Sequence, residues 1–213
     1  MTPPHWGHTR RSDAPVRSES DETAVSAAAG IEPVLAMEGA EMSSPTETAA
    51  NPLVTRPGLD NSLWYGSALI SRMATAAQTG GRYGLLHWRM QQGFSPPAPH
   101  RHGPEDFYIL SGQLRFWVAD QQAVAVAGDL IRTPPGVWHT FVVESDEAEF
   151  LILFAPGGME GFFQELGRPA EAMELPAGRV GPPDATRLRA LGPTYGIEFA
   201  PSGMTAADMD KLP

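Results

Sequence analysis

The chain contains no cysteine, and this absence excludes three kinds of chemistry. Disulfide bonds, thiolate metal sites and cysteine nucleophiles all require the missing thiol. A chain without disulfides is compatible with a reducing compartment, so we expect a cytoplasmic location.

Positive charge is also scarce. The 15 Lys and Arg residues stand against 25 Asp and Glu, which gives a net charge of -10. Phosphate binding needs a clustered basic face. The arginines of the presumed folded part are scattered, apart from Arg187 and Arg189. We therefore expect no nucleic-acid partner.

Long hydrophobic runs are absent as well. No run approaches the roughly 20 apolar residues of a membrane span. The stretch 24–31 near the N-terminal arginines is interrupted by Ser26 and Gly30, so it does not form the apolar region of a secretory signal. We expect neither membrane association nor secretion.

Large apolar residues are rare in residues 1–57, which are rich in Ser, Thr, Ala, Glu and Pro. Such a segment cannot bury enough surface to offset its ordering entropy. We expect a disordered N-terminal tail over 1–57, one folded domain over 58–200 and a frayed C-terminal tail over 201–213.

From Gly58 the chain consists of short runs of β-branched and aromatic residues, separated by the turn residues Gly, Pro, Asn and Asp. This texture predicts an all-β sandwich or barrel. The expected strands are 63–65, 68–73, 83–90, 107–110, 113–118, 123–126, 130–133, 139–143 and 149–154. Apolar residues at helical spacing predict a short helix over 159–166, and Asp184 is a good N-cap for a second helix ending near Leu191.

Two segments carry residues suited to chemistry. His100 and His102 stand two residues apart, so on an extended chain both point to one face, and Glu105 follows after a Gly-Pro turn. His139 follows a rigid Pro-Pro-Gly turn about thirty residues later. Three imidazoles and one carboxylate suit a divalent transition metal such as Fe, Mn, Ni, Cu, Co or Zn.

These segments resemble the two sequence motifs of the cupin family. The residues that match the first motif are Gly93, His100, His102, Glu105 and Gly112, and those that match the second are Gly128, Pro134, Gly136 and His139. The segments 63–66 and 155–167 are similar to single-domain bacterial cupins of the quercetin 2,3-dioxygenase type. The resemblance implies a cupin double-stranded β-barrel (jelly roll) with one or two short C-terminal helices, in which His100, His102, Glu105 and His139 bind one metal ion.

The chain departs from the family pattern in two places. Only Gly103 and Pro104 separate His102 from Glu105, where the family usually has three or four residues. Asp106 therefore competes with Glu105 as the acidic ligand. We prefer Glu105, because its distance of seven residues to Gly112 is that of the family. Val143 replaces an asparagine that often ends the second motif.

Alternation along the strands places Phe107 and Phe141 on the same face as Glu105 and His139. They are expected to line an apolar substrate pocket or to fill the barrel, and His87 is a further, weaker pocket candidate.

The family resemblance implies a dioxygenase that binds a small, enolisable aromatic or flavonol-like substrate and dioxygen. Glu105 would act as ligand and as base, with a pKa raised by burial. The alternatives are an isomerase or cyclase that consumes no oxygen, and a non-catalytic binding module. Because exposed edge strands near the N-terminal segment need cover, we also expect a homodimer.

Overall fold

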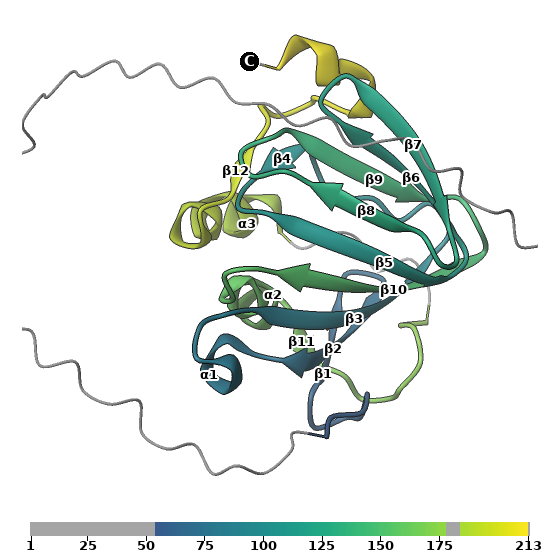
Figure 1. The fold of residues 1–213 in the computed structure, drawn as a ribbon, viewed down its shortest axis with the longest axis vertical. Coiled ribbons are helices and arrows are strands. Elements are labelled where there is room, and N and C mark those ends of the chain that lie inside the picture. The colour runs from purple at the N-terminus through teal and green to yellow at the C-terminus, as the bar shows by residue number, and fades with distance from the viewer. Residues whose placement is uncertain (1–53, 178–183, 213) are drawn as a thin grey trace, which may run out of the picture. The chain divides into compact units, whose positions relative to one another are not determined.

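The computed structural model describes residues 54–177 and 184–212 (Figure 1). Nearly all of the predicted N-terminal tail, residues 1–57, lies outside these ranges. Its disorder stays a prediction.

The described residues form two antiparallel sheets. In spatial order, the seven-stranded sheet consists of β11 (Arg168–Pro169), β1 (Ser62–Tyr65), β2 (Ala68–Ala74), β3 (Gly84–Gln91), β10 (Glu147–Phe154), β5 (Glu105–Ser111) and β8 (Leu130–Thr133). The five-stranded sheet consists of β12 (Glu198–Phe199), β4 (His100–Arg101), β9 (His139–Val143), β6 (Gln113–Val118) and β7 (Gln121–Val126). This mostly antiparallel arrangement with a few short helices confirms the predicted cupin fold class.

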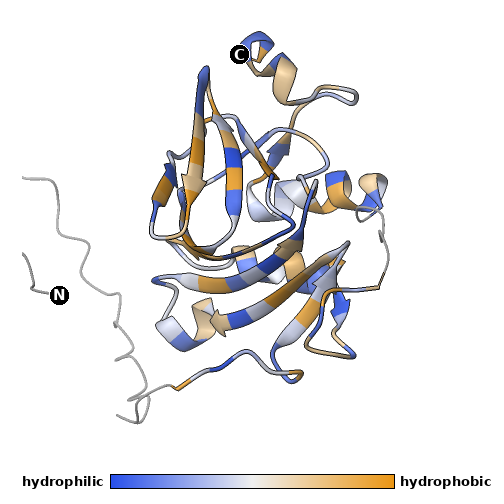
Figure 2. Ribbon diagram, turned by 90° about the vertical axis from the view of Figure 1, so that its right-hand side faces the viewer, coloured by the Kyte–Doolittle hydropathy of each residue, from blue (hydrophilic) through white to orange (hydrophobic). Residues whose placement is uncertain are grey.

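All nine predicted strands are present, since each is a short run of residues that favour strands, bounded by turn residues. Figure 2 shows hydrophobic and hydrophilic residues alternating along the strands. The inward residues of both sheets form the main core, whose fully buried large members include Phe107, Phe116, Phe150, Leu86 and Leu114. Sequence reasoning missed β4, β11 and β12, which are two residues long and too short for periodicity to show.

Short helices lie at one end of the sheets (Figure 1). Helix α2 (Met159–Leu166) was predicted, and α3 (Ala185–Leu191) begins after Asp184, whose carboxylate accepts hydrogen bonds from the backbone N–H groups of Thr186 and Arg187. A single turn, α1 (Ala76–Thr79), was not predicted.

The expected frayed C-terminal tail is wrong for the residues that the structure describes. Residues 206–211 form a 3-10 helix, and Met209 is buried against Trp138 and Ala200. A capping box between Thr205 and Asp208 begins this helix, and the contact of Met209 with the core holds it in place.

Glu160 fixes the position of α2. Its buried carboxylate accepts hydrogen bonds from the backbone N–H groups of Ala76, at 2.5 Å, and Gly158, at 2.8 Å. A Cβ atom at residue 84 would lie 2.3 Å from the Glu160 carboxylate, so glycine is needed at Gly84. The contact holds α2 against α1 and β3, with Met159 and Phe162 turned to the barrel interior.

The sheet edges differ from the expectation behind the predicted homodimer, which was an exposed edge strand near the N-terminal segment. Strand β1 pairs with β11 on its outer side, so the N-terminal strand is not a free edge. Strand β7 is the edge of the five-stranded sheet, and its residues Gln122 and Val124 are exposed.

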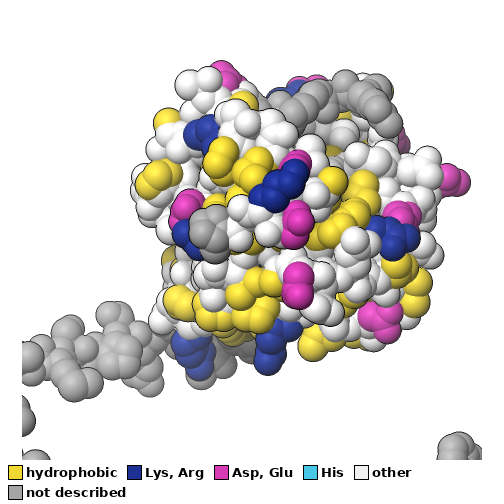
Figure 3. Space-filling model, turned by 90° about the horizontal axis from the view of Figure 1, so that it is seen from above, with side chains coloured by type: hydrophobic (Ala, Val, Ile, Leu, Met, Phe, Trp, Pro, Cys, Tyr) yellow, Lys and Arg dark blue, Asp and Glu magenta, His cyan; other side chains and the backbone are white. Residues whose placement is uncertain are grey.

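The surface shows mixed charge. On the face seen in Figure 3, basic side chains lie apart from one another among acidic and hydrophobic ones. Within the described ranges, no helix is both long enough and apolar enough to cross a membrane.

Candidate metal centre

The two motif segments meet where β4 lies beside β9. His100 in β4 and His139 in β9 are directly opposite each other in the ladder. His102 follows β4, and Glu105 is the first residue of β5. One ring nitrogen from each of His100, His102 and His139 lies within 4.8 Å of the others. The structure therefore brings together the three histidines that the sequence singled out.

The turn before His139 explains this proximity. Gly136 has φ 73, a conformation that favours glycine, and its backbone N–H donates to the carbonyl of His102 at 2.7 Å. The buried hydroxyl of Thr133 donates to the backbone carbonyl of Glu105 at 3.1 Å. The Pro-Pro-Gly turn is thus tied to the strand that carries the other candidate ligands.

Backbone carbonyls fix the tautomer of each imidazole. The Nδ1 atoms lie 3.1 Å from the Ala98 carbonyl for His100, 2.8 Å from the Gly103 carbonyl for His102 and 2.8 Å from the Val137 carbonyl for His139. A carbonyl only accepts hydrogen bonds, so each Nδ1 carries a proton and donates it. In a neutral ring, Nε2 then presents a lone pair, which is how a metal-binding histidine is held.

Glu105 faces two of these nitrogens. Its Oε2 lies 3.4 Å from Nε2 of His102 and 3.3 Å from Nε2 of His139. Both Oε2 of Glu105 and Nε2 of His139 are buried without a hydrogen-bond partner. Opposed buried lone pairs repel unless a proton or a cation lies between them. The three histidines could therefore hold a divalent metal ion, and Glu105 lies against two of them.

Asp106 lies outside this cluster. Its carboxylate accepts hydrogen bonds from the Arg132 guanidinium at 2.8 and 3.2 Å. Successive strand residues point to opposite faces, so Glu105 and Asp106 cannot share one site on a regular β5. The geometry favours Glu105 of the two acids weighed from the sequence.

The pKa values of the cluster show that neighbouring groups outweigh burial at Glu105. Burial alone would raise the pKa of Glu105, but hydrogen bonds and charge from His102 and His139 lower it to about 2. The expectation of a raised pKa is therefore wrong in direction. Burial and the two other histidines lower the pKa of His100 to about 3, whereas the pKa of His102 is raised because Glu105 outweighs the effect of burial.

These shifts predict how zinc binding depends on pH. The raised pKa means that His102 holds a proton above the ordinary histidine range, and zinc must displace it. Affinity is therefore lost as pH falls through that pKa, by about tenfold per pH unit for one displaced proton. His100 contributes little to this pH dependence, because its pKa of about 3 means that the ring is already neutral near the pKa of His102.

Competition titrations between about pH 5 and 8 measure this dependence. In Glu105→Gln the cause of the raised pKa is removed, so the loss of affinity should begin at lower pH. An affinity independent of pH in the unmodified protein would contradict the assignment of His102 as a ligand.

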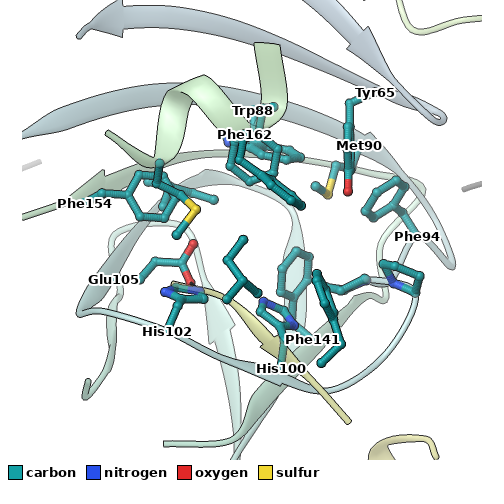
Figure 4. Close-up of a pocket in the computed structure, with 17 residues that line it drawn as sticks. Tyr65, Trp88, Met90, Phe94, His100, His102, Glu105, Phe141, Phe154 and Phe162 are labelled. Atoms are coloured by element: carbon teal, nitrogen blue, oxygen red, sulfur yellow. Dashed lines mark ion pairs between the residues drawn. The ribbon is translucent and has the colours of Figure 1, made fainter. Parts of the chain in front are cut away.

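A cavity of about 60 Å³ lies beside the cluster in the barrel interior (Figure 4). Its residues are mostly apolar, and the labelled ones are Tyr65, Trp88, Met90, Phe94, His100, His102, Glu105, Phe141, Phe154 and Phe162. Phe141 is the one cavity aromatic that the sequence had proposed. The others come from β1, β3, β10, β12, α2 and loops, where no local pattern distinguishes a cavity residue from a core residue.

Two predicted pocket residues do not line this cavity. Phe107 faces inward as predicted but lies deeper, with ring centroids 5.0 Å from Phe116 and 5.7 Å from Phe141. His87 points to the opposite side of β3, where its Nε2 lies 2.6 Å from Oε1 of Glu149. Phe107 is therefore a packing residue, and His87 belongs to an ion pair outside the cavity.

Comparison with known proteins agrees with this fold and cluster. The family described as the cupin domain matches residues 86–156, which contain all four candidate ligands. Quercetin 2,3-dioxygenase of Bacillus subtilis (strain 168) is 28% identical over 128 residues. That match covers 60% of this chain but 38% of the Bacillus enzyme.

Solved cupin structures are also similar. An RmlC-like cupin from Shewanella frigidimarina matches with 17% identity and a TM-score of 0.43 over 50% of this chain and 93% of its own. A cupin-superfamily sugar phosphate isomerase from Silicibacter pomeroyi matches with 21% identity and a TM-score of 0.40 over 47% and 75%.

Proposed function

The chain is a cupin of the quercetin 2,3-dioxygenase-like type, and from this premise we propose that it is a metal-dependent dioxygenase of an enolisable aromatic or flavonol-like small molecule. His100, His102, Glu105 and His139 would hold one divalent transition-metal ion, either Fe, Mn, Ni, Cu, Co or Zn.

The observation that carries this proposal is the set of opposed lone pairs. The Nδ1–H groups of three neighbouring imidazoles are occupied by backbone carbonyls, and two of these imidazoles, His102 and His139, face the buried carboxylate of Glu105. An ion that accepts five or six ligands would keep positions free for other molecules after three nitrogens and one oxygen of the protein have bound. When bound, the ion would polarise an enol oxygen of the substrate and bring dioxygen to it.

The protein's own groups supply orientation and proton transfer. Glu105 is ionised at neutral pH, since its pKa lies at about 2, so it can accept a hydroxyl proton only from a group whose acidity is itself increased. Phe141 and Phe154 exclude water from one side of the cluster and offer flat apolar contact to a ring. An enolisable aromatic molecule has both a hydroxyl whose acidity can be increased and a flat apolar ring.

Oxygen uptake tests the proposal. Protein reconstituted separately with Fe, Mn, Ni, Cu and Co is expected to consume oxygen with at least one substrate from a panel of flavonols, hydroxyaromatics and 1,3-dicarbonyls. An oxygen electrode with product analysis by mass spectrometry measures this. Product without oxygen uptake would indicate an isomerase or cyclase, and binding without turnover a binding module; either outcome would overturn the dioxygenase proposal.

Two further expectations stay proposals. A cytoplasmic location is supported by the absence of cysteine. A homodimer is supported by the exposed edge of β7, and light scattering that gives only the chain mass of 22.9 kDa would refute it.

A further inference from the structure

The hydroxyl group of Tyr65 has no hydrogen-bond partner among residues 54–177 and 184–212, although the residue is only 5% exposed. Tyr65 ends β1 and lines the cavity. In Figure 4 its hydroxyl points inward beside Met90 and Phe94, across the cavity from His102 and Glu105. This oxygen is not among the fully buried atoms that lack a partner, so it is accessible from the cavity and can bond a molecule bound there.

Polar groups are distributed unevenly along the cavity, and the Tyr65 hydroxyl lies away from most of them. Polar ligand groups gather at one end, in His100, His102 and Glu105. The walls between the ends are apolar, with Phe94, Phe141 and Met90 among them. Small-molecule sites commonly combine apolar walls with a few polar groups that fix orientation. Tyr65 supplies such a group at the end opposite the histidines.

A second hollow lies beside the histidine end of this cavity. It has a volume of about 420 Å³ and shares His102, Phe154 and Met159 with the first cavity, whereas Tyr65 lines only the first. The smaller cavity, of about 60 Å³, has less room than the roughly 150 Å³ cavity that holds benzene in another protein, so nothing larger than one ring can enter it, and its walls must move apart to admit that ring.

We propose that Tyr65 is a specificity-determining residue whose hydroxyl bonds an oxygen at the far end of a flat, one-ring molecule while the near end of that molecule binds at the metal centre. The ligand class is then a monocyclic enol with a second hydroxyl or carbonyl oxygen across the ring. The near-end contact rests on the proposed function, but the Tyr65 contact is independent of the reaction type. Burial raises the pKa of Tyr65, so the hydroxyl stays protonated and can donate.

Kojic acid and allomaltol provide a matched pair of probes. Both are flat hydroxypyranones that bind metal ions at one side, and they differ because the hydroxymethyl group of kojic acid, across the ring, is a methyl group in allomaltol. Zinc-loaded protein is expected to bind kojic acid roughly tenfold more tightly than allomaltol, the usual effect of one neutral hydrogen bond. Tyr65→Phe should weaken kojic acid binding by about the same factor and leave allomaltol unchanged.

Isothermal titration of both probes measures this, with Tyr108→Phe as the control because Tyr108 is exposed and outside the cavity. Equal affinities of the unmodified protein for the two probes, no binding of either, or an equal loss for both in Tyr65→Phe would each overturn the proposal. The comparison of the two probes on the unmodified protein needs no variant, so it tests the proposal even if Tyr65→Phe does not fold. Failure of the proposed dioxygenase function would appear separately, as missing oxygen uptake, while the preference between the probes remained.

Discussion

Replacing His139 by alanine is expected to remove nearly all bound metal while the protein remains folded. His139 is 2% exposed, lies opposite His100 in the ladder and faces Glu105 at 3.3 Å, so its loss removes a nitrogen from the centre of the cluster. Changing even an outer-shell partner typically costs 10- to 100-fold in metal affinity, so loss of a ligand should cost at least about 100-fold. His100→Ala should behave in the same way.

The fold should survive because the core is built from other residues. The main core contains Phe107, Phe116 and Phe150 and none of the histidines. Elemental analysis after dialysis gives the metal content, and circular dichroism reports folding. His87→Ala is the matched control, since this buried histidine pairs with Glu149 away from the cluster and its loss should leave the metal content unchanged. Stoichiometric metal in both His139→Ala and His100→Ala would exclude the proposed centre.

The sequence could predict strands and candidate ligands because both depend on local patterns. Short runs of β-branched and aromatic residues between turn residues predicted strands such as β9 and β10. The glycines and prolines around His100 and His139 indicated turns that constrain those side chains. The structure ties one of these turns to the other motif through the hydrogen bond from Gly136 to His102.

What the sequence could not predict depends on neighbours that are distant along the chain. Alternation gives the face of a strand but not the depth in the barrel, so it could not separate Phe141, which lines the cavity, from Phe107, which fills the core. His87 was only a weak pocket candidate, and its side could not be read from the sequence; in the structure Leu86 and Trp88 take the inward positions of β3. The pKa of Glu105 was inferred from burial alone, whereas two histidines determine its direction.

Glu105→Gln is expected to cut turnover by about 100-fold or more per bound metal while the protein keeps part of its metal. The amide oxygen of glutamine can still act as a ligand, but a neutral amide cannot accept the substrate's proton. Because the pKa of Glu105 is about 2, the carboxylate is ionised throughout the neutral range, and the loss should persist across it rather than vanish at high pH. Rates at saturating metal, normalised to elemental analysis, separate the loss of proton transfer from the loss of metal.

Asp106→Asn tests whether the correct acid has been chosen. Asp106 pairs with Arg132 on the outer side of β5, where the Arg132 side chain is 69% exposed. An exposed ion pair of this kind contributes only about 0–1 kcal/mol to stability, so metal content and turnover should stay close to those of the unmodified protein. Glu105→Gln and Asp106→Asn each replace a carboxylate by the corresponding amide, at neighbouring positions that face opposite sides of one strand. Loss of turnover in Asp106→Asn with retention in Glu105→Gln would therefore show that the shortened loop after His102 delivers Asp106, and not Glu105, to the metal.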